Sequence, residues 1–106
     1  MSTLSVEFKR KIASFYMQNK QELEKSSVGA MESFASEISK LIEAEKDHYQ
    51  GSHDLEVLGQ SMKHLKDDLT RLKNYAPGTD DYDFTFNDCK SLMNSTKRWL
   101  KMEGLI

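Results

Sequence analysis

Residues 55–72 read LEVLGQSMKHLKDDLTRL, and their apolar side chains return at alternating intervals of three and four positions. That alternation is typical of an α-helix with one narrow apolar seam, which lies along another helix. The seam residues are Leu55, Leu58, Met62, Leu65, Leu69 and Leu72. This stretch therefore predicts a helix that packs against other helices. A seam of this width suits either the core of a bundle or the contact between two copies of a chain.

Three further stretches of the chain repeat apolar residues with a helical period. Pro77 is the single proline of the 106 residues, which leaves room for long helices on both sides of it, and no sustained alternation predicts strands. Short connections between helices of similar length favour antiparallel neighbours. We therefore predict an all-α fold, an antiparallel up-down-up-down four-helix bundle formed by one domain, 1–106. Its helices are expected over about residues 5–25, 29–50, 54–74 and 85–103.

Glycine and serine residues indicate where two of these helices begin and end. Gly29, with Glu32 three positions later, predicts a modest N-terminal cap for the second helix. Gly51 suits the end of that helix, and Ser52 or Asp54 suits the cap of the next one. A helix that continues through Gly51 is the alternative.

The longest connection is expected before the fourth helix, where Pro77 and Gly78 are followed by a loop, 79–83, that contains three aspartates. Thr85 is predicted to cap the fourth helix, with Asp88 as its reciprocal partner three residues later. Phe84 before this cap and Cys89 within the helix are expected to form a hydrophobic staple.

Charge and composition exclude several classes of function. The net charge of −2 argues against a general nucleic-acid binder, which needs a basic excess. No unbroken apolar run reaches about 18 residues, so no membrane span is expected, and residues 1–10 do not resemble a signal peptide. The single Cys89 cannot form an internal disulfide, which favours a reducing compartment. We therefore expect a cytoplasmic protein.

No motif in the sequence predicts an enzyme, a cofactor or a metal site. Glycine-framed nucleophiles and phosphate-binding glycine loops are absent from the sequence, and Cys89 lies on an apolar stripe. His48 and His53 lie near acidic residues, but Gly51 and Ser52 interrupt the helical turn that a pair of zinc-binding histidines needs. Polar surface around a turn is the expected role of these two histidines.

His64 is the residue with the most chemical interest. It lies beside the seam, so its side chain is expected to project outward and to pair with Asp68 four residues later. The string MKHLKD at 62–67 resembles the histidine-phosphotransfer motif, in which His is followed by any residue, Leu, Lys and Gly. The resemblance implies that His64 accepts a phosphoryl group. Here Leu and Lys come one place early, and Asp67 and Asp68 fill positions where the family has a small residue. Residues 53–60, HDLEVLGQ, resemble the phosphoacceptor region of a class of sensor kinases, with extra residues between its two parts.

Aromatic, basic and methionine side chains on the first and fourth helices predict a surface for a partner protein. The predicted contact residues are Arg10, Tyr16, Met17, Arg98, Trp99, Lys101 and Met102. Lys9 and Lys97 are expected on the same surface. Leu105 and Ile106 either extend this apolar patch or fold over the end of the bundle, and the sequence leaves both open.

We therefore predict a small non-enzymatic protein that acts by protein–protein interaction, as an adaptor, regulator, inhibitor or immunity-type protein. The partner is expected to be another protein, with a homodimer through the seam as one version. The alternative function is a phosphotransfer-like signalling role for His64.

Overall fold

The computed structural model describes residues 4–106, and this part of the chain contains helices and no strand. In chain order the helices are α1 (Val6–Gln18), α2 (Lys20–Glu24), α3 (Val28–Glu45), α4 (His53–Leu72) and α5 (Asp80–Met102). The predicted all-α class is confirmed. Within residues 4–106, no helix combines the length and the apolar character that crossing a bilayer requires.

The first predicted helix, 5–25, is interrupted at Asn19. The Asn19 side-chain amide donates a hydrogen bond of 2.9 Å to the carbonyl of Phe15, and its backbone φ of −114° is not helical. Asn side chains compete with helical hydrogen bonds in this way. The remainder of the predicted helix is the short α2, which buries Leu23 and ends before Ser27, the cap of α3. The Oγ atom of Ser27 accepts from the Ala30 N–H at 3.3 Å, so Gly29 is not the cap.

The second predicted helix ends at Glu45 rather than at residue 50, and residues 46–50 form turns. These turns place the Tyr49 ring edge-on against the Phe8 ring, with 5.4 Å between ring centroids. The Tyr49 hydroxyl also donates to the Ser5 Oγ at 2.8 Å. Gly51 follows with a φ of +79°, which favours glycine, and Ser52 caps α4 by accepting from the Leu55 N–H. The predicted break at Gly51 is confirmed, and of the two predicted caps, Ser52 and Asp54, the structure selects Ser52.

The fourth predicted helix begins five residues earlier than expected. Thr79, not Thr85, is the N-cap of α5, and its Oγ1 accepts from the Tyr82 N–H at 3.2 Å. Asp80, Asp81 and Asp83 therefore lie in the first turn of the helix, where their charge complements the positive end of the helix dipole. Thr85 is buried inside the helix, and the Phe84 side chain is 80% exposed. The predicted staple between Phe84 and Cys89 is wrong, because Phe84 is exposed to solvent whereas Cys89 is buried.

Replacement of Thr79 by alanine tests this start of α5. The variant loses the only side-chain cap of the helix, so we expect its free energy of unfolding to fall by about 1 kcal/mol. Urea unfolding followed by far-UV circular dichroism measures the change. Thr70→Ala is the matched control, because Thr70 is an exposed residue within α4, and its removal is expected to change stability by less than about 0.5 kcal/mol. Equal stability of both variants would contradict the assigned cap.

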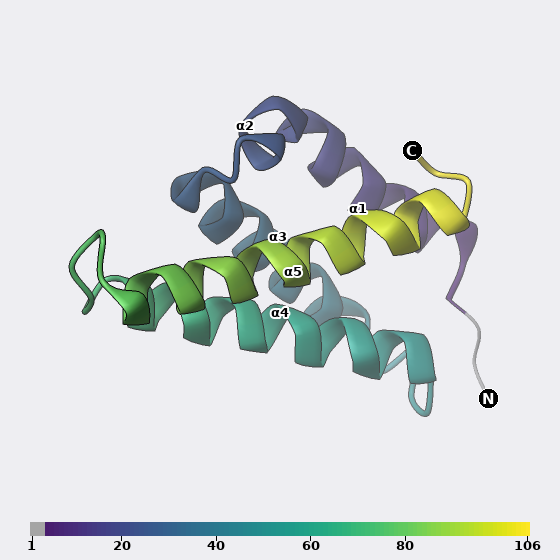
Figure 1. Ribbon diagram of the computed structural model, residues 1–106. Helices are drawn as coiled ribbons and strands as arrows, with labels where there is room; N and C mark the ends of the chain where they lie inside the picture. The colour runs from purple at the N-terminus through teal and green to yellow at the C-terminus, as the bar shows by residue number, and fades with distance from the viewer. Residues whose placement is uncertain (1–3) are drawn as a thin grey trace.

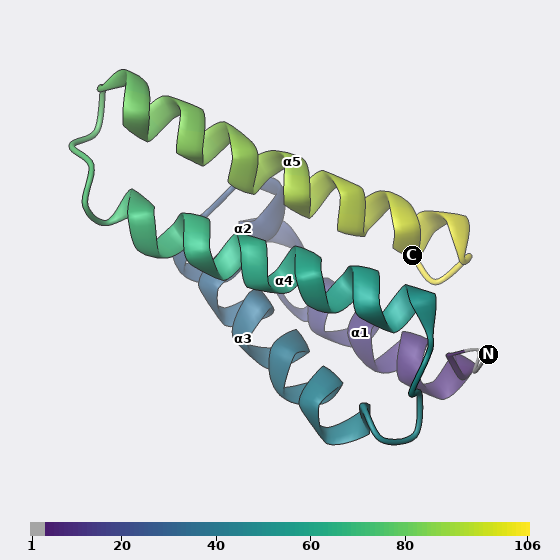
Figure 2. The ribbon, with the colours of Figure 1, turned by 90° about the horizontal axis from the view of Figure 1, so that it is seen from below.

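Helix α4 is the centre of the fold, because it packs against α3 on one side and α5 on the other. All six seam residues of 55–72 are buried within the chain, which confirms that this helix packs against other helices. Figures 1 and 2 show α4 and α5 side by side and antiparallel, whereas α1 and α3 lie obliquely to this pair. The regular bundle of four similar helices is not confirmed, since α2 is a separate short helix and the helices diverge. Besides the seam, the largest fully buried side chains are Ile12, Met31, Phe34, Ile38, Cys89 and Leu100.

Candidate functional site

Helices α4 and α5 share a face with two groups of side chains, a cleft and a polar cluster. The cleft lies between the first turns of α4 and the last turns of α5 and has a volume of about 200 Å³. Small side chains face each other here, Ser61 on α4 and Ser95 on α5, and they leave the space between the helices unfilled. The full lining of the cleft is His53, Asp54, Val57, Leu58, Ser61, Ser95, Thr96 and Trp99.

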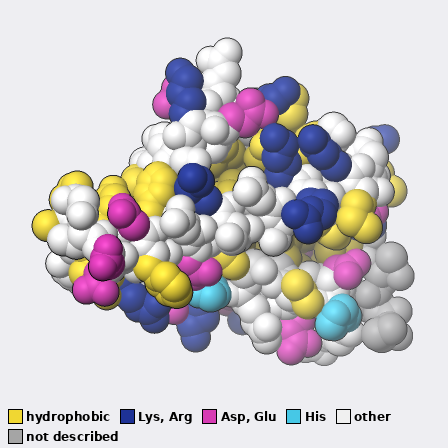
Figure 3. Space-filling view, in the orientation of Figure 1, with side chains coloured by type: hydrophobic (Ala, Val, Ile, Leu, Met, Phe, Trp, Pro, Cys, Tyr) yellow, Lys and Arg dark blue, Asp and Glu magenta, His cyan; other side chains and the backbone are white. Residues whose placement is uncertain are grey.

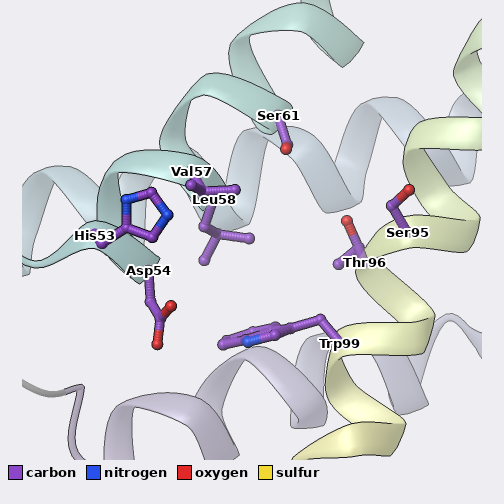
Figure 4. A pocket seen from close by; sticks show the side chains of 8 residues that line it. All are labelled: His53, Asp54, Val57, Leu58, Ser61, Ser95, Thr96 and Trp99. Atoms are coloured by element: carbon purple, nitrogen blue, oxygen red, sulfur yellow. The ribbon is translucent and has the colours of Figure 1, made fainter.

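The cleft is apolar around Trp99, with hydroxyl side chains at one end and a polar edge at the other. Figure 4 shows the Trp99 ring extending from α5 across the end of the cleft, with Val57 and Leu58 above it on α4. Val57 is 46% exposed and lies next to the Trp99 ring in the lining of the cleft, so apolar surface of both residues is open to a ligand. Asp54 and His53 supply the polar edge. A concave apolar surface with a few polar groups is the usual form of a binding site.

The predicted partner-binding residues do not form one patch. The prediction that Tyr16 contacts a partner is wrong. Tyr16 is only 2% exposed and packs edge-on against the Phe34 ring, with 6.1 Å between ring centroids. The structure places Trp99 in the cleft, half-buried against the core. Leu105 and Ile106 are partly buried on the core, so the C-terminal tail folds over the end of the helices. The remaining predicted contact residues are exposed, and these are Arg10, Met17, Arg98, Lys101 and Met102.

Two lysines of the predicted surface are used inside the chain. The Lys9 Nζ lies 2.9 Å from the Glu103 Oε2, and this pair joins the start of α1 to the end of α5. The Lys97 Nζ lies 3.4 Å from the Glu24 Oε1, which joins α5 to α2. Both lysines therefore neutralise carboxylates of their own chain and are poor candidates for contact with an acidic partner.

The polar cluster joins the middle of α4 to the middle of α5. The His64 Nε2 lies 2.8 Å from the Asp88 Oδ2 on α5 and 3.4 Å from the Asp68 Oδ2 on its own helix. The Arg71 Nη1 donates a hydrogen bond of 3.0 Å to the other oxygen of Asp68, Oδ1. Asp68 is only 2% exposed, and its Oδ2 has no hydrogen-bond partner among residues 4–106. Figure 3 shows histidine side chains beside acidic ones at two places on the face formed by α4 and α5.

Burial changes the acidity of two groups in this region. Burial and, after it, the nearby Asp88 carboxyl together raise the pKa of Asp68 to about 6, against the opposite influence of His64 and Arg71. Burial also raises the pKa of the Cys89 thiol to about 11, with Asp68 and Asp88 adding to the effect. Cys89 is therefore an unreactive core residue in the folded protein.

The environment of His64 bears on the phosphotransfer hypothesis. The side chain is 52% exposed and pairs with Asp68, which confirms the predicted outward position and the pairing. The sequence does not predict Asp88 as a member of this cluster, because its spacing from Thr85 is that of a helix cap. The Nε2 of His64 faces two carboxylates, and negative charge at this position repels a phosphoryl group. His64, Asp68 and Asp88 form the one group of metal-ligand side chains found among residues 4–106.

The fold and these two groups define a small all-helical protein with an apolar cleft and a charged cluster on its α4–α5 face. Comparison with protein-family models, with curated proteins and with solved structures finds no match. The function is therefore inferred from the residues of this chain.

Proposed function

We propose that this protein acts by binding another protein, without catalysing a reaction, and that the α4–α5 cleft is the binding surface. The observation that carries the proposal is the position of Val57, which is 46% exposed at the mouth of an apolar cleft with Trp99 across its end. Tryptophan is enriched among the residues that dominate the binding energy of protein interfaces. Adaptors, regulators, inhibitors and immunity-type proteins work through surfaces of this kind.

The size and charge of the cleft describe the partner. Pockets that hold small-molecule ligands usually measure about 300–1,000 Å³. At about 200 Å³ this cleft is smaller, and it suits one large apolar side chain of a partner better than a whole metabolite. Asp54 at the edge favours a lysine or arginine next to that side chain. We therefore propose a partner segment that presents an apolar anchor beside a basic residue.

Two other hypotheses receive less support. The seam of 55–72 is buried within the chain, so a second copy would have to bind at another surface. Phosphotransfer through His64 would place the phosphoryl group against Asp68 and Asp88. We retain the cytoplasm as the proposed location, because the single cysteine of the chain suits a reducing compartment.

Photo-crosslinking in cells that naturally express the chain tests the proposal. A photoreactive amino acid replaces Ser95 at the cleft, and in a separate variant it replaces Glu37, an exposed residue of α3. We expect a discrete protein adduct from position 95 and none from position 37. The same adducts from both positions, or no adduct from position 95, would contradict the proposed surface.

The captured partner then permits a quantitative test with purified proteins. Val57→Lys places a charge at the mouth of the cleft, and we expect the affinity to fall at least about tenfold. Glu56→Lys is the matched control on the neighbouring exposed position and is expected to change affinity by less than about threefold. Val57 is already exposed, so its replacement leaves the core intact. Equal affinity of wild type and Val57→Lys would rule out the cleft as the binding surface.

A further inference from the structure

We propose that His64, Asp68 and Asp88 bind a divalent transition-metal ion of the Zn²⁺ class, which joins α4 to α5. One ligand atom from each residue, the imidazole nitrogen and two carboxylate oxygens, lies within 4.8 Å of the others. The three residues come from two helices that lie side by side and pack against each other. The site is separate from the cleft, whose lining contains none of these residues.

One spacing between the ligand atoms matches that of a tetrahedral ion, and a second is close to it. Zn²⁺ binds imidazole nitrogen and carboxylate oxygen at about 2.0–2.2 Å, so two ligands of a tetrahedral site are about 3.4 Å apart. The His64 Nε2 and the Asp68 Oδ2 are 3.4 Å apart. The His64 Nε2 and the Asp88 Oδ2 are closer, at 2.8 Å, and need to separate by about half an ångström. Both of these side chains are partly exposed, so a small rotation is enough.

The buried carboxylate of Asp68 points to a ligand at this position. Its Oδ2 is buried and has no hydrogen-bond partner among residues 4–106, and an unsatisfied buried polar atom of this kind is costly. The Nε2 of an imidazole carries at most one hydrogen, so His64 can donate to only one of the two carboxylates that it faces. A metal ion can bind the imidazole and both carboxylates together, which a proton on His64 cannot do.

Arg71 positions the buried ligand. Its guanidinium donates to the Asp68 Oδ1 at 3.0 Å and leaves the Oδ2 directed at His64. Hydrogen bonds from neighbouring residues commonly orient metal-binding carboxylates in this way. Asp68 is therefore expected to bind the ion through one oxygen, and Arg71 offsets part of the charge of the two carboxylates.

The ligand types select the class of ion. One imidazole with two carboxylates suits Zn²⁺, Co²⁺, Mn²⁺ or Fe²⁺, whereas Ca²⁺ and Mg²⁺ prefer sites made of oxygen ligands alone. Three protein ligands leave a fourth position of a tetrahedral ion for water or for a side chain from outside the chain. The half-exposed His64 side chain gives the ion access from solvent.

Calorimetric titration of the full chain with ZnCl₂ tests this site and needs no partner protein. After removal of metals with EDTA, we expect one ion per chain and a rise in melting temperature, because the ion binds only when α4 and α5 are together. Co²⁺ provides a second readout, since a tetrahedral site with these ligands gives visible absorption bands. No binding of either ion would overturn the proposal.

Variants assign the binding to the cluster. His64→Gln and Asp88→Asn change partly exposed side chains, and each is expected to weaken Zn²⁺ binding at least about tenfold without loss of the helical fold. Asp68→Asn is expected to do the same, with circular dichroism confirming that it folds. Two variants serve as matched controls. His53→Ala removes another histidine that lies beside an aspartate on this face, and Cys89→Ala removes the neighbouring thiol. Both are expected to keep the wild-type affinity for Zn²⁺. Wild-type binding by Asp88→Asn, or loss of binding in His53→Ala, would also overturn the proposal.

Discussion

Replacement of Leu65 by alanine is expected to lower the free energy of unfolding by about 3 kcal/mol. Leu65 is fully buried at the middle of the α4 seam, where α4 lies between α3 and α5. Removal of a buried leucine side chain loses its transfer free energy and leaves a cavity, at a cost of about 2–5 kcal/mol. A small domain has a total stability of about 5–15 kcal/mol, so this single change removes a large part of it.

Urea unfolding of the purified chain at two protein concentrations measures this effect. Lys66→Ala is the matched control, because Lys66 is the next residue of α4 and is exposed. We expect the control to change stability by less than about 0.5 kcal/mol. The midpoint of unfolding should not depend on protein concentration, since Leu65 is buried within one chain. A concentration-dependent midpoint would instead indicate that the seam pairs with a second copy, and a loss below about 1 kcal/mol for Leu65→Ala would contradict the burial of Leu65.

The second large effect concerns Cys89, which is expected to resist alkylation at least about 100-fold in the folded protein. The side chain is fully buried, and burial raises the pKa of its thiol from 9.0 to about 11. Thiolate is the reactive form, and a raised pKa favours the neutral thiol. At pH 8 the thiolate fraction therefore falls from about one in ten to about one in a thousand. Exclusion of the reagent by the surrounding helices adds to this protection.

The same change in pKa predicts how stability depends on alkaline pH. Below pH 9 the thiol is protonated in both the folded and the unfolded chain, so the full stability is present. Between pH 9 and about 11 the unfolded chain releases the proton while the folded chain keeps it, and stability falls as pH rises. Substitution of Cys89 by alanine should remove this contribution.

A time course of iodoacetamide labelling, followed by mass spectrometry, measures the protection. The wild-type chain is compared in native buffer and in concentrated urea. The control carries Cys89→Ala together with Ser95→Cys, which places the single thiol at the exposed edge of the cleft. We expect the control to label at nearly the unfolded rate in native buffer. Equal labelling rates for Cys89 and for the thiol at position 95 would contradict the packing of α5 against α4.

Sequence signals predicted the helices well and their ends less well. The start of α5 was misplaced because Thr85 and Asp88 have the spacing of a capping box, while Thr79, with a proline-glycine turn before it, is the true cap. The end of α3 was misplaced because residues 46–50 have no strong breaker before Gly51. These turns are stabilised by contact of Tyr49 with Phe8 and Ser5, which are distant in the sequence.

The candidate site was predicted only in part, although the geometry of a hairpin offers a signal for the rest. His64 and Asp88 each lie twelve positions from Ala76, in the connection between α4 and α5. Two antiparallel helices of equal rise bring such equidistant residues opposite each other. The same relation pairs His53 with Trp99 at the cleft. Val57 was a further signal, because it is the apolar residue of 55–72 that lies off the seam.

Periodicity and capping residues alone indicate that this chain is helical, that 55–72 packs along other helices through one seam, and that a helix begins soon after Gly51. These features depend on neighbours three or four positions apart, and local spacing encodes them. Contacts between helices decide the remaining features: the burial of Tyr16 against Phe34, the exposure of Val57 beside Trp99, and the meeting of His64 with Asp88. Such features depend on which helix faces bring distant residues together, and the stripe of a single helix does not specify that.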